Sequence, residues 1–318
     1  ESLPDGTSRS ISYNVCGNCP AYSAYYVART TSGAPTQWVY VDTLGREIRK
    51  TVQGFDGSLI HEDRQFNGRG ELVKSSERYY SGDAIYWTTY AYDDMGRVKT
   101  ETSPDGGVVA TYYNGLSTTV TNALNQSKTQ VKNPLGLIVS VSEPDSSISY
   151  TYGAFGQVAG TTDALGNVTW INYNTRGFKV AMSDPDLGVW NYSYDALGQL
   201  LSQTDAKGQT TTFTYDLLGR MTQRVQPGQT DTWTYDTTLV GHIAEASTNN
   251  GYSREHDYDG SGRPSSVAYT MDITGTASTS YDAYGRPATL SYPTGFAVKH
   301  IYNSWGYLAE VRNAASNK

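Results

Sequence analysis

Tyr194-Asp195-Ala196-Leu197-Gly198 is followed, twenty-one residues further on, by Tyr215-Asp216-Leu217-Leu218-Gly219. Both stretches carry an aromatic residue first, an acidic residue second and a glycine fifth. We call this five-residue pattern the frame. Thirteen frames can be placed between residues 41 and 306, at steps of 19 to 26 residues. Because a fixed period means that one small unit recurs, we expect neighbouring units to pack against one another.

The same residue types recur at the same positions of the frame along the chain. Its first residue is aromatic in eleven of thirteen cases, its second is Asp or Asn in twelve, and its fifth is Gly in eleven. The structural repeat signature that we take from the clearest frames comprises Tyr92, Asp93, Gly96, Arg97, Tyr152, Gly156, Tyr173, Gly177, Tyr194, Asp195, Gly198, Tyr215, Asp216, Gly219, Arg220, Tyr258, Asp259, Gly262, Arg263, Tyr281, Asp282, Gly285, Arg286, Tyr302 and Gly306.

Each frame predicts the end of one strand, a tight turn and the start of the next strand. Asp or Asn can bond the backbone two residues on, and Gly adopts a backbone angle that a side chain forbids. A second turn, such as Pro104-Asp105-Gly106, falls in the middle of the repeat, and segments rich in Thr, Tyr and Val lie between the turns. The prediction is an all-β fold of serial antiparallel β-hairpin repeats of about 21 residues, forming a curved or spiral sheet.

Composition bounds the kind of protein. Hydrophobic residues make up only 37% of the 318 residues, while Tyr is abundant at 27, which predicts a thin core between repeats. The net charge of −7 without a basic run disfavours nucleic acid as a partner. We expect no membrane span, because no apolar stretch approaches the ~20 residues that a spanning helix needs.

The repeat also sets the expected domain boundaries. Residues 38–318 form the repeat array, and residues 1–37 are a less regular segment that fits two degenerate repeats around Tyr13 and Tyr25-Tyr26. A stacked array is expected to end in a polar cap. Because residues 313–318 stop near a mid-repeat turn with no such cap, we expect the chain to be a piece of a longer protein.

Cys16 and Cys19 are the only cysteines, in the pattern Cys16-Gly17-Asn18-Cys19. A local disulfide or two structural thiols are the favoured interpretation, with a metal site and a redox site as alternatives. A zinc site needs about four ligands, and the four histidines show no paired spacing. A redox motif of this type usually starts a helix in an α/β unit, which the pattern here does not predict.

Other candidate sites are explained by the repeat itself. Residues 257–262 resemble part of a calcium loop, but Asp259 and Gly262 fall in register with the frame. Asp184-Pro185 occupies a mid-repeat turn, and His256 and His300 each stand two residues before a frame Tyr, as expected of strand residues. The usual nucleophile, phosphate-loop and zinc-protease motifs are absent from the sequence. We therefore predict no catalytic residue, no metal and no cofactor.

The aromatic residues have two interpretations. With 27 Tyr and 6 Trp, some rings could line an open face that suits sugars or a client protein. The alternative is that the rings are the packing between repeats.

The six-residue form Tyr-Asp-x-x-Gly-Arg, found at 92–97, 215–220, 258–263 and 281–286, resembles the RHS/YD-repeat family over roughly residues 38–318. That family includes bacterial polymorphic toxins, cocoon components of insecticidal toxin complexes, and animal teneurins. The resemblance implies a β-hairpin strip that spirals into a hollow shell around a toxic domain, or that supports adhesion in teneurins. The bacterial shells usually close with a C-terminal core holding an aspartyl self-cleavage site. No such segment follows the last frame here, so no catalytic residue is carried over.

The resulting hypothesis is a non-catalytic structural segment of a secreted or cell-surface bacterial β-shell that encapsulates a toxin or other cargo. Its expected partners are the rest of the shell and an enclosed toxin domain. The alternatives are a carbohydrate- or receptor-binding adhesion module and, third, a carbohydrate-active enzyme, which would need paired carboxylates in an aromatic cleft.

Overall fold

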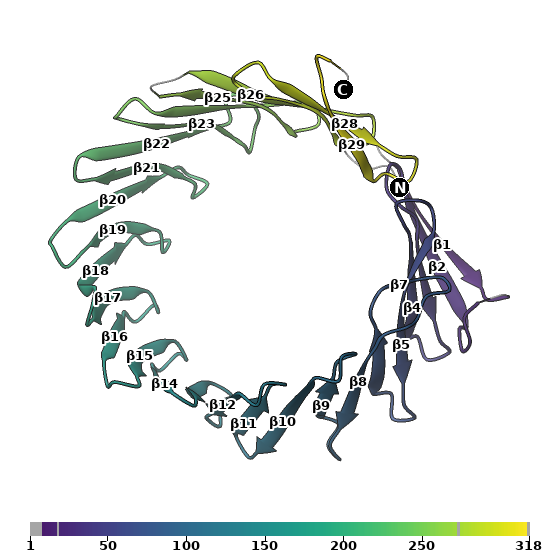
Figure 1. The fold of residues 1–318 in the computed structure, drawn as a ribbon. Coiled ribbons are helices and arrows are strands. Elements are labelled where there is room, and N and C mark those ends of the chain that lie inside the picture. Colours follow the sequence, from purple (N-terminus) through teal and green to yellow (C-terminus); the bar gives the residue numbers. More distant parts are fainter. Residues whose placement is uncertain (1–7, 18, 272–273, 317–318) are drawn as a thin grey trace. The chain divides into compact units, whose positions relative to one another are not determined.

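The computed structural model describes residues 8–17, 19–271 and 274–316, and over these residues it contains 29 β-strands and no helix (Figure 1). Every strand pair whose register is known is antiparallel, as in β18 (Gly188–Tyr194) with β19 (Leu200–Thr204). The predicted all-β fold of serial antiparallel hairpins is therefore confirmed.

The chain divides into two compact units. Unit 1 comprises Glu1–Val108, Asp257–Ala268 and Thr274–Lys318, and unit 2 comprises Val109–His256 and Tyr269–Ile273. The early strands of unit 1 are β1 (Arg9–Val15), β2 (Tyr25–Thr31), β3 (Gln37–Val41), β4 (Glu47–Gln53), β5 (Leu59–Phe66), β6 (Leu72–Ser76), β7 (Tyr79–Tyr80), β8 (Trp87–Tyr92) and β9 (Val98–Thr102). Its late strands are β26 (Gly275–Tyr281), β27 (Pro287–Ser291), β28 (Ala297–Tyr302) and β29 (Leu308–Asn313).

Unit 2 is a run of hairpins in which each strand turns back beside the one before it, as Figure 1 shows for β16 to β20. Besides β18 and β19, its strands are β11 (Ser117–Thr121), β12 (Ser127–Lys132), β13 (Ile138–Glu143), β14 (Ser146–Tyr152), β15 (Val158–Asp163), β16 (Val168–Tyr173), β17 (Lys179–Asp184), β20 (Thr210–Tyr215), β21 (Met221–Gln226), β22 (Gln229–Tyr235) and β23 (Ile243–Thr248). The strands at the unit boundaries are β10 (Val108–Asn114), β24 (Ser253–Tyr258) and β25 (Pro264–Thr270).

The frame forms one kind of turn, which we call the frame turn. Between β18 and β19 the Gly198 N–H donates to the Asp195 carbonyl at 3.3 Å, and the Asp195 N–H donates to the Gln199 carbonyl at 3.0 Å. Gly198 has a φ of 89°, and the register shifts by one residue between Ser193 and Tyr194. This is a turn closed by a left-handed glycine and a β-bulge, a common solution for short hairpin loops.

The second kind of turn, which we call the mid-repeat turn, joins the end of one repeat's first strand to its second strand. Between β19 and β20 the Gly208 N–H donates to the Asp205 carbonyl at 3.0 Å. Frame turns and mid-repeat turns alternate along the chain. Because successive strands are antiparallel, the two kinds of turn lie at opposite edges of the strip of hairpins.

The core is thin. Among the described residues, the buried hydrophobic side chains are Val27, Val39, Val41, Tyr79, Phe213 and Ala244, and four of these six lie on the early strands of unit 1. There β5 pairs with both β6 and β7, while β6 pairs with β8. This branching lets Tyr79 pack its ring 5.4 Å from that of His61.

Unit 1 also brings early and late strands together through their turns. The frame turn at 303–306 meets the mid-repeat turn at 54–57: Asn303 Nδ2 donates to the Phe55 carbonyl at 2.6 Å, and the Tyr307 hydroxyl donates to the Gln53 carbonyl at 2.7 Å. The rings of Phe55 and Tyr307 lie 6.2 Å apart. The frame turn at 282–285 meets the mid-repeat turn at 31–34 in the same way.

Candidate functional site

The Asp or Asn at the second position of a frame accepts hydrogen bonds from the backbone of its own turn, and Asp216 is an example. Asp216 accepts hydrogen bonds at Oδ1 from the N–H groups of Leu218 and Arg220, both at 2.9 Å, and at Oδ2 from Arg220 Nε at 2.7 Å. Partial burial would raise the pKa of Asp216, but these hydrogen bonds outweigh it and hold the pKa below its ordinary value. The carboxylate is thus occupied by its own turn.

The same Asp–Arg ion pair recurs wherever the frame is followed by arginine. The closest nitrogen–oxygen distance is 2.7 Å in each pair: Asp42–Arg46, Asp93–Arg97, Asp216–Arg220, Asp259–Arg263 and Asp282–Arg286. The ion pair with Asp holds the planar guanidinium group in an orientation that extends toward the next repeat.

Four of these arginines lie over the aromatic residue of the next frame. The distance from Cζ to the ring centroid is 4.4 Å for Arg220 over Tyr235, 4.2 Å for Arg263 over Tyr281, 4.0 Å for Arg286 over Tyr302 and 4.7 Å for Arg46 over Phe66. Such contacts stabilise by about 0.5–2 kcal/mol, depending on desolvation. We call this series the Asp–Arg–aromatic ladder.

The frame tyrosines add a second link between repeats, because their hydroxyls donate to backbone carbonyls of the preceding repeat. In each case the acceptor stands two residues after the preceding frame's glycine: Tyr92 to Leu72, Tyr152 to Ile138, Tyr173 to Val158, Tyr215 to Leu200, Tyr235 to Met221, Tyr281 to Pro264 and Tyr302 to Pro287. Tyr194 packs its ring 5.2 Å from that of Phe178. The glycines of the signature frames all have positive φ.

These links place the predicted signature residues. They do not gather at one point but are spread along the strip, each set at its own frame turn. Sequence reasoning identified the Tyr, Asp, Gly and Arg positions but missed the carbonyl acceptors and the stacking of Arg on the next ring. The recurrence of Arg directly after the fifth-position Gly was the signal that could have indicated a stacking role.

Cys16 and Cys19 form a disulfide in the segment between β1 and β2, with their Cα atoms 5.4 Å apart. The segment continues through Pro20 to Tyr22, whose φ is 70° and whose side chain is exposed. It therefore projects a large aromatic ring from the face of the early strands.

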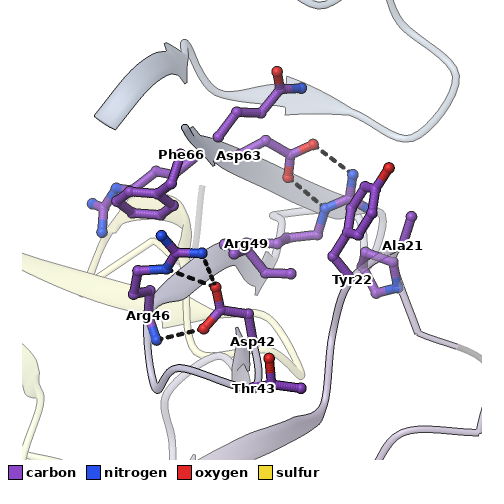
Figure 2. Close-up of a pocket in the computed structure, with 12 residues that line it drawn as sticks. Ala21, Tyr22, Asp42, Thr43, Arg46, Arg49, Asp63 and Phe66 are labelled. Atoms are coloured by element: carbon purple, nitrogen blue, oxygen red, sulfur yellow. Dashed lines mark hydrogen bonds and ion pairs between the residues drawn. The ribbon is translucent and has the colours of Figure 1, made fainter. Parts of the chain in front are cut away.

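The ring of Tyr22 forms one wall of a pocket of about 730 Å³ in unit 1, which Figure 2 shows. The floor carries two Arg–Asp pairs. Arg49 donates to Asp63 through Nε at 2.5 Å and through Nη2 at 2.6 Å, and it lies beside Tyr22. Arg46 pairs with Asp42 and lies against Phe66.

The polar groups on the pocket floor are extensively hydrogen-bonded. Arg49 Nη2 also donates to the Tyr79 hydroxyl at 2.8 Å, and this hydroxyl donates to Asp63 at 2.7 Å. Burial, followed by the hydrogen bond to Asp63, raises the pKa of Tyr79 to about 12. Since both carboxylates are paired with arginine, the pocket offers a polar floor and two aromatic rings but no carboxylate poised as a general base.

The histidines and acidic turns that the sequence singled out are not among the residues that line the pocket. His300 Nδ1 lies 3.2 Å from the Pro287 carbonyl, and burial lowers the pKa of His256. Asp184 accepts hydrogen bonds from the N–H groups of Asp186 and Leu187 within its own turn. Across the part of the chain that the structure describes, no three or more His, Cys, Asp or Glu side chains converge as metal ligands would.

The fold and these contacts define the class of protein: its β-hairpin repeats follow one another along the chain and are joined by an Asp–Arg–aromatic ladder. Comparison with known families then matches the RHS repeat to residues 133–168 and 194–231. Two segments of the chain thus match the RHS repeat, which confirms the resemblance that its sequence pattern indicated. A search of curated protein sequences gives no significant match.

Solved structures share the fold. The crystal structure of TcdB2-TccC3 matches with a TM-score of 0.76 at 15% identity, covering 95% of this chain and 20% of that one. That of TcdB2-TccC3-TEV matches with a TM-score of 0.74 at 15% identity, covering 96% and 19%. The Photorhabdus luminescens Tc holotoxin pore matches with a TM-score of 0.73 at 14% identity, covering 98% and 19%. The present chain thus spans about a fifth of each of these chains.

A helix with the length and apolar character that crossing a membrane requires is not found among the described residues.

Proposed function

We propose that this chain is a non-catalytic wall segment of a larger β-shell that encloses a toxin or another protein cargo. The observation that carries the proposal is the Asp–Arg–aromatic ladder together with the tyrosine–carbonyl hydrogen bonds. Both sets of contacts join repeats to their neighbours. They also engage the recurring Asp, Arg and Tyr side chains in contacts within the protein. A wall needs this kind of continuous lateral linkage, whereas an active site needs polar groups that are left available to a substrate.

The fold comparison supports the same conclusion. The matched chains belong to Tc toxin structures, and the present chain corresponds to about a fifth of their length. We infer that its partners are the remaining part of the same shell and the enclosed cargo. The mechanism is steric: a wall keeps the cargo away from the producing cell and from proteases until release.

The disulfide between Cys16 and Cys19 favours a place outside the cytoplasm for this wall. Disulfides persist in oxidising compartments and are rare where thiols are kept reduced. A secreted or cell-surface location is therefore part of the proposal.

Electron cryo-microscopy of the intact gene product that contains this chain tests the proposal. We expect the hairpin strip to form a wall around density that is not part of the strip. A solid core packed directly against both faces of the strip, with no enclosed space, would overturn it.

The pocket of unit 1 supports a second candidate function, the binding of a saccharide. Sugars present C–H faces that pack on aromatic rings and hydroxyls that accept hydrogen bonds, and pockets of about 300–1,000 Å³ suit small ligands. Tyr22 and Phe66 provide rings, while Arg46 and Arg49 use only some of their five N–H donors on Asp42, Asp63 and Tyr79. Because both guanidinium charges are neutralised locally, a polyhydroxylated ligand fits better than a strong anion.

A glycan array followed by titration of any binding sugar tests this second candidate. Tyr22→Ala should weaken binding at least about tenfold, because it removes one aromatic wall. Tyr13→Ala is the matched control, since Tyr13 is also exposed but does not line the pocket. Absence of any array signal, or equal binding by both variants, would rule the candidate out.

A further inference from the structure

Residues 77–86, which we call the β7 segment, attach to β5 through a very short strand. β7 spans only two residues, and these pair with Ile60 and His61 of β5. One further backbone hydrogen bond runs from the Ser81 N–H to the Leu59 carbonyl at 3.2 Å. Because so little backbone pairing is present, the attachment of this segment depends strongly on side-chain contacts.

The imidazole of His61 provides such contacts on both of its nitrogens. Nε2 lies 2.7 Å from the Ser81 hydroxyl oxygen, and Nδ1 lies 2.9 Å from the hydroxyl oxygen of Thr51 on β4. The rings of His61 and Tyr79 are 5.4 Å apart. His61 is 9% exposed and Thr51 is 1% exposed. A buried imidazole therefore links β4 and β5 to the β7 segment.

The charges closest to this imidazole already balance one another. Arg49 on β4 and Asp63 on β5 face the same side of the sheet as His61, because each stands two residues from a member of the buried cluster. Arg49 Nε and Nη2 donate to Asp63 at 2.5 and 2.6 Å, and the Tyr79 hydroxyl donates to Asp63 at 2.7 Å. A proton on His61 would thus add a buried positive charge beside a carboxylate that is already paired.

A second set of charged residues borders His61. Lys50, Glu62 and Arg78 line a cavity of about 20 Å³ together with it. Lys50 pairs with Glu62 in register, and Arg78 Nε lies 3.8 Å from the Glu62 carboxylate. Arg64 Nη2 lies 3.2 Å from the same carboxylate. Three cations therefore surround one anion, and this set does not favour a protonated imidazole either.

The surroundings of His61 accordingly favour its neutral form. Burial, followed by the positive charge of Arg49, lowers the pKa of His61 below its ordinary value of 6.5, and the opposing effect of Asp63 is smaller. An imidazole exposed to water by detachment of the β7 segment would regain a pKa near 6.5. The attachment is therefore fully stabilised above about pH 6.5 and weakens as the pH falls below it.

We propose that His61 is an acid-sensitive switch, which holds the β7 segment on β5 at neutral pH and releases it when the imidazole takes up a proton. Release withdraws the Tyr79 hydroxyl from Arg49 and Asp63 on the pocket floor. It also uncovers the edge of β5 near Leu59, while the second half of β5 stays paired with β6. The inference goes beyond the wall function and does not depend on it.

Hydrogen–deuterium exchange of the 318-residue chain, followed by mass spectrometry from about pH 8 to pH 5, tests the switch. After correction for the intrinsic rate at each pH, the protection of residues 77–86 should fall by about threefold or more. His61→Gln keeps a side chain that donates and accepts hydrogen bonds but does not titrate, so its protection should not change with pH. His256→Gln is the matched control: burial lowers the pKa of His256 too, but this residue lies on β24.

The ring signals of His61 in the wild-type protein, followed by nuclear magnetic resonance, give a second readout that holds even where His61→Gln leaves the segment detached at every pH. Protonation of the ring should coincide with the loss of protection, and different midpoints would overturn the proposal. Constant protection of the wild type, a pH response retained by His61→Gln, or one lost in His256→Gln would overturn it as well.

Discussion

Arg286 stacks on the ring of Tyr302, with its Cζ atom 4.0 Å from the ring centroid, and so joins one repeat to the next. Its Nε donates to Asp282 at 2.8 Å, and its Nη1 donates to the Gly33 carbonyl at 3.0 Å. One guanidinium group therefore contacts its own frame turn, the following repeat and an early mid-repeat turn. A side chain that combines these contacts should matter more than its surface position suggests.

Replacing Arg286 by Lys should lower the free energy of unfolding by about 1–2 kcal/mol, because lysine keeps the charge but loses the planar fork that stacks and donates in three directions. Urea denaturation followed by circular dichroism measures the change. Arg78→Lys is the control, since the Arg78 side chain is 71% exposed and makes only a 3.8 Å ion pair. Equal effects of the two substitutions would show that the stacking contributes nothing.

Gly106 allows the energetic cost of a positive φ to be measured separately from steric clashes. Its φ is 87°, and no described atom lies within 4 Å of where a Cβ would stand. Gly106→Ala should therefore destabilise by about 1–2 kcal/mol through backbone conformation alone. Gly68→Ala provides the comparison, because Gly68 has equal space and no such φ. If thermal unfolding shifts alike in both, left-handed geometry is not what selects glycine.

The tyrosine–carbonyl hydrogen bonds predict a graded response at Tyr215. Tyr215→Phe removes only the hydroxyl that donates to the Leu200 carbonyl at 3.0 Å, and should cost about 0.5–1.5 kcal/mol. Tyr215→Ala also removes the half-buried ring and should cost about 3 kcal/mol. Tyr112→Phe, at a ring that is 67% exposed, should leave the unfolding midpoint unchanged. A phenylalanine variant as stable as the wild type would mean that the hydroxyl contact is dispensable.

Acid should weaken the link between Arg220 and Asp236. The hydrogen bonds from Arg220, then that from the Gly241 N–H, lower the pKa of Asp236 from 3.8 to about 2. A carboxyl group whose pKa is lower in the folded state contributes stability that is fully present above its ordinary pKa of 3.8 and is lost as the pH falls through about 2.

The urea midpoint of the wild type should therefore fall across that interval, and that of Asp236→Asn should fall less, because the substituted amide does not titrate. The other frame carboxylates still titrate in both proteins, so the informative quantity is the difference between the two curves. Parallel curves would contradict the assignment.

The hairpins were predictable from the sequence because their chemistry is local. The Asp195 side chain and the left-handed Gly198 act within one turn, so their identity and spacing are enough to indicate where a strand ends. The RHS-repeat recognition and the all-β fold follow from this and are confirmed. Asn125 shows how the pattern tolerates exceptions, since it adopts a φ of 61° where most mid-repeat turns have glycine.

The remaining features depend on contacts that spacing does not encode. The pairing of β5 with both β6 and β7 interrupts the simple order of hairpins, and the step between the frames at residues 66 and 92 is only one residue longer than the step before it. The pocket joins Tyr22, from a segment with no frame, to Arg49 and Asp63 on two later strands. Nothing in the period of the repeat places that segment over those strands.

Because nearly every strand pairs with its neighbour in chain order, the hydrogen-bonding partner of each strand is synthesised within seconds of it. Folding can then keep pace with translation, one hairpin at a time, without waiting for distant parts of the chain. The same locality makes the length of such a protein easy to change during evolution. Duplicating a single unit of about 21 residues adds two strands while leaving all existing pairings intact except at the site of insertion.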